Sequence, residues 1–193
     1  IILAGGKSKR FGSDKALSIY QGKPLIQAVF QVAENLTNNI IIVTNSPEKM
    51  GFINYPKYKD LIQGTGSLGG IYTGLHYSNQ NLNIVLPCDM PFISPECIRF
   101  LLENTNGNDI TVPYHRNMLE PLCAVYSKKC LPFIKDQIDT GDYQIFQFYD
   151  KVKTKQLKFS IELPFYHENL FSNINTKSDL ENISNHSGNN EFH

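Results

Sequence analysis

The chain has 193 residues, of which 41% are hydrophobic and 19% are charged, and its 18 basic and 18 acidic residues balance. This length and composition predict one soluble globular domain with a substantial core. The balanced charge favours neither a nucleic-acid partner nor an anionic membrane, and no apolar run approaches the ~20 residues needed to cross a bilayer.

Cysteine and histidine patterns point to no metal centre of their own. Cys88, Cys97, Cys123 and Cys130 form no C-x-x-C pair, and no histidine cluster accompanies them, so a zinc site is not expected. The five histidines match no ligand or nucleophile pattern and are expected in core or solvated positions. The simplest interpretation is a reduced, cytoplasmic protein.

The chain opens with a short apolar strand that runs through Leu3 and Ala4 into Gly5 and Gly6, followed by a basic loop with Arg10 and Lys15. Backbone amides of a glycine-rich turn can converge on an anion because no Cβ blocks its approach. The two cationic side chains add fixed positive charge. The string is neither a Walker loop nor G-x-G-x-x-G. It predicts a nucleoside triphosphate pocket, and the alternative is a tight turn with solvated lysines.

Strand and helix signals alternate further along. Nearly continuous apolar runs, typical of strands covered on both faces, occupy 40–44 and 83–87, and further strands are predicted at 110–112 and 122–126. Helices are predicted over 24–35, over 68–78, and from Pro95 onward with Ser94 as N-cap.

This alternation predicts a single α/β domain over residues 1–183: a doubly wound, mostly parallel sheet with helices on both faces, in the Rossmann-like manner. Residues 184–193 are polar and are expected to form a loose tail. Open α/β sheets bind ligands beyond the carboxyl ends of their strands. The residues to examine are therefore Gly5 and Gly6, Asn45, 60–70, Asp89 and 173–175.

Asp89 follows the apolar run 83–87 and precedes Met90-Pro91. A carboxylate at a strand end that faces a triphosphate is a natural oxygen ligand for Mg²⁺, which would neutralise phosphate charge and orient the transferred group. The alternative is an Asp in an Asp-x-Pro turn, and the opening glycine motif favours the metal role.

Two features suggest contacts to a base or ribose. The glycine-rich stretch 64–70, which includes Gly69, could lie flat against a base and present its amides, or it could be a flexible surface loop. Asp60 could accept hydrogen bonds from N1–H and the exocyclic amine of guanine, although its residue type alone favours a solvated loop position.

Near the end of the chain, Thr176 and Asp179 resemble a capping box with Asp in place of Glu. That motif does not explain Asn173 and Asn175, which would point the same way in an extended segment. One of their amide oxygens could complete a metal shell or hold a second substrate.

The string from Leu3 to Lys15, together with segments 69–71, 88–91, 120–126 and 173–176, resembles the molybdenum cofactor guanylyltransferases, often called the MobA family. The signature of that family's opening is L-A-G-G-x-x-x-R-[MF]-G-x-D-K. Phe11 stands where Met is commoner, and both residues are apolar. The resemblance covers most of the chain, but no motif falls between 135 and 165, so it assigns no pterin-binding residues.

The resemblance implies transfer of GMP from GTP to molybdopterin with Mg²⁺ and release of pyrophosphate, and it leaves room for proteins that deliver or receive the cofactor. Carried over by position, it implies the following roles: backbone contacts to the nucleotide at Leu3, Ala4 and Gly5; phosphate binding at Lys15; GTP contacts at Asn45 and Asp60; GTP and magnesium binding at Asp89. Arg10, Asn173 and Asn175 match motif positions without a defined role.

The expected mechanism is an in-line displacement in which Lys15, Arg10 and Asp89 stabilise charge. Two alternatives remain at this point. One is a cytidylyltransferase acting on molybdopterin or on a sugar or isoprenoid precursor, and such relatives more often open with L-A-A-G. The other is a non-catalytic nucleotide-binding module, against which the presence of both Lys15 and Asp89 argues.

Overall fold

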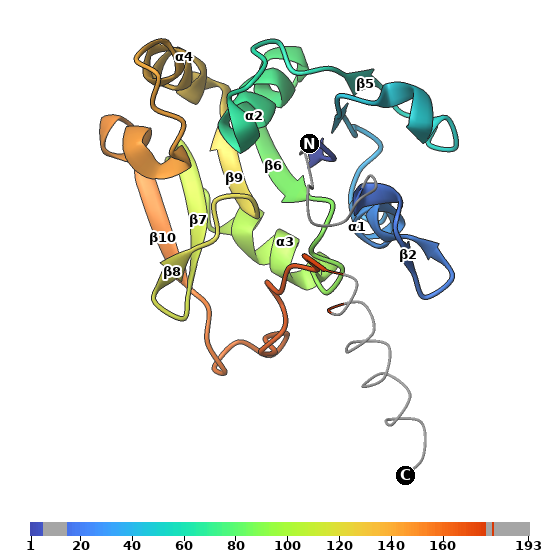
Figure 1. Ribbon diagram of the computed structural model, residues 1–193. Helices are drawn as coiled ribbons and strands as arrows, with labels where there is room; N and C mark the ends of the chain where they lie inside the picture. Colours follow the sequence, from blue (N-terminus) through green and yellow to red (C-terminus); the bar gives the residue numbers. More distant parts are fainter. Residues whose placement is uncertain (6–14, 177–178, 180–193) are drawn as a thin grey trace.

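A computed structural model describes residues 1–5, 15–176 and 179 (Figure 1). Its central element is an eight-stranded sheet in the order β10-β7-β9-β6-β1-β4-β5, with β8 paired to β7. The strands are β1 (Ile2–Leu3), β4 (Ile42–Val43), β5 (Lys57–Tyr58), β6 (Leu82–Pro87), β7 (Ile110–His115), β8 (Met118–Leu119), β9 (Ala124–Ser127) and β10 (Thr154–Lys158). A separate antiparallel pair joins β2 (Ile19–Tyr20) to β3 (Lys23–Pro24).

The sheet is mostly parallel, as the alternating pattern predicts. Strands β5, β4, β1 and β6 run parallel to one another, and β10 runs parallel to β7. Strand β9 lies antiparallel between β6 and β7, and β8 forms a hairpin with β7. The carboxyl ends of the parallel strands and the start of β9 therefore meet along one edge of the sheet.

Helices cover both faces, as expected. The helices α1 (Leu25–Glu34) and α3 (Pro95–Glu103) pack with one apolar core cluster, whereas α2 (Gly66–Tyr77) and α4 (Leu131–Asp139) pack with the other. Short 3-10 helices are η1 (Lys15–Leu17), η2 (Pro47–Met50), η3 (Lys128–Cys130) and η4 (Ile145–Lys151). Within the described residues, no helix combines the length and the apolar character that a membrane span requires.

The glycine-rich stretch is largely helix rather than loop, because α2 begins at Gly66 and not near Leu68. Two of its glycines are needed for close packing. A Cβ on Gly70 would lie 3.2 Å from Leu3 Cδ2, and one on Gly69 would lie 1.8 Å from Thr65 Oγ1. Small residues thus let α2 lie directly against the central strand β1.

The predicted start of α3 is confirmed, with Pro95 as the first helical residue and Ser94 as N-cap. The Ser94 hydroxyl accepts a hydrogen bond from the Cys97 amide at 3.2 Å. We expect Ser94→Ala to lower the free energy of unfolding by about 1 kcal/mol in urea denaturation, because that amide loses its partner. Ser94→Asp keeps an acceptor and should retain most of the stability; equal losses in both variants would contradict the capping role.

Candidate active site

The parallel strands bring four of the predicted residues to one edge of the sheet. Gly5 follows β1, Asn45 follows β4, Asp60 follows β5 and Asp89 follows β6. Leu3 and Ala4 are buried in and just after β1, and the sheet uses part of their backbone, because Ala4 N donates to the Val43 carbonyl at 2.8 Å and the Leu3 carbonyl accepts from Cys88 N at 3.0 Å. A Cβ on Gly5 would lie 3.8 Å from Asn45 Nδ2, which places these two residues side by side.

Asn45 and Asp60 form a linked pair. The Asn45 amide donates to Asp60 Oδ2 at 2.8 Å, and the Asp60 backbone amide donates to Asn45 Oδ1 at 3.3 Å. The pairing of β4 with β5 positions both, since Thr44 N donates to the Tyr58 carbonyl at 2.9 Å. The Asp60 carboxylate is thereby oriented, and its second oxygen, Oδ1, lies on the side of Gly70.

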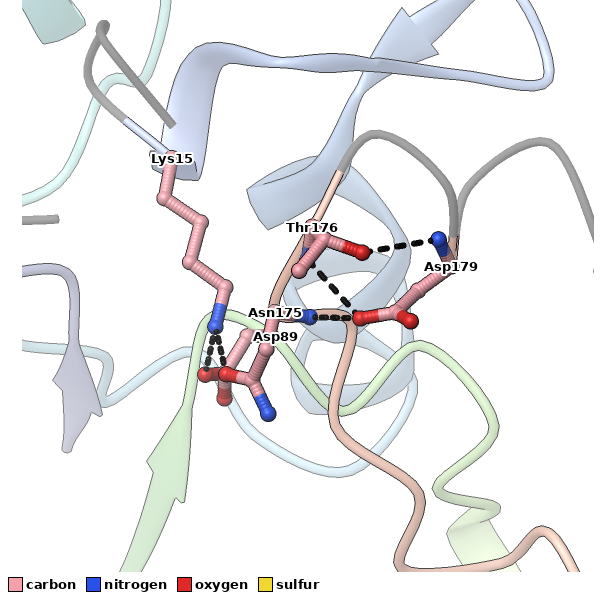
Figure 2. A network of polar contacts seen from close by, with 5 residues as sticks. All are labelled: Lys15, Asp89, Asn175, Thr176 and Asp179. Atoms are coloured by element: carbon pink, nitrogen blue, oxygen red, sulfur yellow. Dashed lines mark hydrogen bonds and ion pairs between the residues drawn. The ribbon is translucent and has the colours of Figure 1, made fainter. Parts of the chain in front are cut away.

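Lys15, Asp89 and Asn175 meet at the centre of this edge (Figure 2). The Lys15 ammonium lies 2.5 Å from Asp89 Oδ2 and 2.6 Å from Asn175 Oδ1. Both charged side chains are largely buried, with 14% of Lys15 and 21% of Asp89 exposed. Residues 160 positions apart in the sequence thus form one polar centre beside the opening strand.

This centre fits a divalent cation. Mg²⁺ prefers oxygen ligands and is usually held by one or two carboxylates, together with water and substrate phosphates. The Lys15 ammonium, itself a cation, lies between a carboxylate and an amide oxygen. The other oxygen of Asp89, Oδ1, is buried and has no hydrogen-bond partner among the described residues. No group of three or more His, Cys, Asp or Glu side chains suited to a metal occurs within those residues, so protein ligands alone would not complete a shell.

A tight turn fixes the position of Asn175. The amides of Asn175 and Thr176 donate to Asp179 Oδ2 at 2.7 and 2.8 Å, and the Thr176 hydroxyl accepts from the Asp179 amide at 3.0 Å. The reciprocal bonds confirm the predicted capping box. The amide of Asn175 is the main cause of a lowered pKa at Asp179, and the Thr176 bonds and the nearby Lys15 charge add to it.

Residues 173–175 alternate between exposed and buried, as expected for an extended segment, although they form no strand. Ile174 is buried, whereas Asn173 and Asn175 are exposed, and Ile174 N donates to the Asp89 carbonyl at 2.9 Å. Gly69 is buried against Thr65, which leaves no room for a larger side chain at this position. Gly6 and Arg10 lie outside the described residues.

Sequence reasoning assigned no role to a second polar cluster at the same edge. The β7–β8 hairpin turns through Arg116 and Asn117, both with positive φ, and Glu120 follows it. His115 Nδ1 lies 3.9 Å from Glu120 Oε1, and His115 Nε2 lies 3.0 Å from the Tyr166 hydroxyl. The sequence held one signal, the Glu-Pro dipeptide directly before the predicted strand 122–126, but only the hairpin shows that Glu120 lies at this edge.

The fold and the polar centre define a class of protein, the nucleotidyltransferases. The structure of molybdopterin-guanine dinucleotide biosynthesis protein A from Archaeoglobus fulgidus superimposes with a TM-score of 0.80, at 26% identity and over 97% of both chains. A CMP:2-keto-3-deoxy-manno-octonic acid synthetase shares the fold at 14% identity, with a TM-score of 0.72 over 97% of this chain and 96% of the other.

Within this class, the chain belongs to the MobA-like NTP transferase family, whose domain matches residues 1–154. A relative from Flavobacterium johnsoniae, named a probable molybdenum cofactor guanylyltransferase, is 35% identical over 95% of this chain and 94% of its own. A molybdenum cofactor guanylyltransferase from Desulfosudis oleivorans is 34% identical over 94% of this chain and 91% of its own.

Glu120 gives the site a measurable pH signature. Burial raises the pKa of its carboxyl from 4.5 to about 7. Between these values the native state binds more protons than the unfolded chain, so this residue makes stability fall as pH rises. We expect Glu120→Gln to match the wild-type melting temperature near pH 5 and to exceed it at pH 8.

Melting curves at the two pH values test this, with the exposed Glu162 changed to Gln as the control. If the melting temperature of Glu120→Gln at pH 8 does not exceed that of the wild type, the Glu120 carboxyl ionises without a cost in stability.

Proposed function

We propose that the protein transfers GMP from GTP to molybdopterin, with or without bound molybdenum, and releases pyrophosphate. The observation that carries the proposal is the Lys15 ammonium held between Asp89 and Asn175 at the carboxyl ends of β1 and β6. Two findings support the choice of nucleotide and acceptor. The chain belongs to the family, and it matches nearly the whole length of relatives that are named for this activity.

The chemistry proposed for this edge is an in-line displacement. The terminal phosphate of the acceptor forms a bond to the α-phosphorus of GTP, and the bond from that phosphorus to the bridging oxygen of pyrophosphate breaks. A phosphate nucleophile is already anionic and needs no general base, so the protein's work is to hold two anions together and to stabilise charge. Lys15 supplies a buried cation for this purpose, and Arg10 is proposed as a second.

Mg²⁺ is the cation we propose for the polar centre, where Asp89 and Asn175 would hold it. When bound, it would neutralise phosphate charge and act as a Lewis acid. Lys15 then has a phosphate as an alternative partner to Asp89. Asn173, exposed directly before the buried Ile174, is proposed to contact the second substrate.

Guanine recognition is assigned to the pair of Asn45 and Asp60. Asn45 already occupies one oxygen of Asp60 and so orients the carboxylate. A carboxylate offers two acceptors to the adjacent N1–H and amine donors of guanine, whereas cytosine presents no such pair of donors. Backbone groups of Leu3, Ala4, Gly5 and Gly6 would contact the rest of the nucleotide, with Gly69 at the start of α2 nearby.

The proposed setting is the cytoplasm, with GTP and molybdopterin as substrates and cofactor-delivery proteins as further partners. Four buried cysteine thiols are usual for a protein in a reducing compartment. The balanced charge gives no support for a nucleic-acid or membrane partner.

Asp89→Asn should abolish metal-dependent pyrophosphate release from GTP plus molybdopterin, because the amide keeps the shape but loses the charge that holds the cation. Lys15→Ala should lose most of the rate while the protein stays folded. A coupled pyrophosphate assay measures both, with Asp136→Asn on the exposed side of α4 as the control. Normal turnover of Asp89→Asn would remove the carboxylate from the mechanism.

Nucleotide preference is tested by thermal shift with GTP, CTP, ATP and UTP in the presence of Mg²⁺. A ligand at 100 times its Kd adds about 2.7 kcal/mol of stability, which is roughly 5–10 °C for a chain of this size. We expect GTP to give the largest shift and Asp60→Asn to reduce it selectively. A larger shift with CTP would favour a cytidylyltransferase; GTP binding without product from any authentic acceptor would favour a non-catalytic module.

A further inference from the structure

Glu120 lies at the same edge of the sheet as Asp89 but on the opposite side from the nucleotide elements. Asp89 follows β6 and Glu120 precedes β9, and these antiparallel neighbours pair with Val85 opposite Ala124. The residues after β6 and those before β9 therefore emerge together. Asn45 follows β4 and Asp60 follows β5, on the other side of β1. The edge thus has two halves with Asp89 between them.

One stretch of chain connects the second half to the polar centre. After β10 the chain runs back along this edge, in orange to red in Figure 1. The Phe171 ring lies 5.2 Å from the His115 ring, and Ile174 N donates to the Asp89 carbonyl at 2.9 Å. The surroundings of Glu120 and the polar centre are therefore joined by one stretch of packed chain.

The Glu120 carboxylate has acceptor capacity that the described residues leave unused. Only 16% of its side chain is exposed, the His115 ring, whose pKa is lowered by burial, lies 3.9 Å away, and its oxygens accept no hydrogen bond within the described part of the chain. His115 is itself held by the Tyr166 hydroxyl. A largely buried carboxylate whose oxygens still reach the surface and have unused acceptor capacity is suited to a ligand that brings its own donors.

We propose that Glu120 recognises the pterin ring of the acceptor by accepting hydrogen bonds from its N3–H and 2-amino groups. The two carboxylate oxygens match these two adjacent donors, and the His115 ring beside Glu120 is held in place by the rings of Tyr166 and Phe171. The inference rests on the proposed function, since it takes the acceptor to be a pterin. It assigns the acceptor's ring to the side of β7 and β9 and its phosphate to the polar centre formed by Lys15 and Asp89.

Guanine carries the same pair of donors, so the position of Glu120 decides between the two rings. Asp60 serves the guanine on the β5 side, where Asn45 orients it. Glu120 lies beyond β6, with β1, β4 and β6 between it and β5. An effect of Glu120 on GTP affinity would therefore contradict the assignment.

The test uses two fluorescent probes, 6-carboxypterin and 6-carboxylumazine. Lumazine has a carbonyl in place of the 2-amino group, so it presents an acceptor where pterin presents a donor. The wild-type protein, loaded with a non-hydrolysable GTP analogue and Mg²⁺, should bind the pterin roughly tenfold or more tightly than the lumazine. Glu120→Gln should reverse this preference, because its amide accepts from N3–H and donates to the carbonyl.

Glu120→Ala is the second variant and should lose the preference without reversing it. Glu162→Gln, on the exposed turn of the same edge, should keep the wild-type ratio. Circular dichroism melts confirm folding, and GTP affinity should stay unchanged in all variants. The proposal would be overturned if Glu120→Gln kept the wild-type ratio of pterin to lumazine affinity, or if it lost GTP binding instead.

Turnover distinguishes this proposal from the proposed function. With GTP and molybdopterin, Glu120→Gln should raise KM for molybdopterin roughly tenfold or more and leave KM for GTP unchanged. If the wild-type protein forms no dinucleotide, the proposed function fails. The ratio of the affinities for the two probes still decides whether Glu120 binds a pterin.

Discussion

The site depends on the parallel pairing of β1 on both of its sides. Ile2 N and Ala4 N donate to the carbonyls of Ile41 and Val43 at 2.8 Å, and Leu86 N and Cys88 N donate to Ile1 and Leu3 at 2.9 and 3.0 Å. These four bonds fix the ends of three strands relative to one another. Gly5, Asn45 and Asp89 follow those ends, so their separations are set by backbone geometry rather than by flexible side chains.

Much of the architecture was predictable because the central strands are buried on both faces and read as apolar runs. The runs at 40–44 and 83–87 became β4 and β6, and the periodic segment 24–35 became α1. Strands β5 and β10 carried no such signal. The first has two half-buried residues, and the second is an edge strand rich in lysine and glutamine. The reversed direction of β9 also had no local signature, since pairing direction is a property of the whole sheet.

The candidate site was predictable to the extent that it follows strand ends. Asp89, Asn45 and Asp60 were found in this way, and their convergence needed only the parallel topology. The contact between Lys15 and Asn175 spans 160 positions, and no local pattern encodes such a distance. Glu120 was missed for a related reason: it reaches the edge through a hairpin, after a turn at Arg116 and Asn117.

The ammonium of Lys15 gives this edge a tethered counterion. The Lys15 ammonium offsets the charge of the Asp89 carboxylate and repels a second cation, so the pair has little attraction for a bare metal ion from solution. A triphosphate offers Lys15 a competing anionic partner, and the negative charge left at Asp89 is then matched by the cation that the nucleotide carries. We therefore expect metal and nucleotide to enter as one complex, and without substrate the Lys15–Asp89 pair carries no net charge.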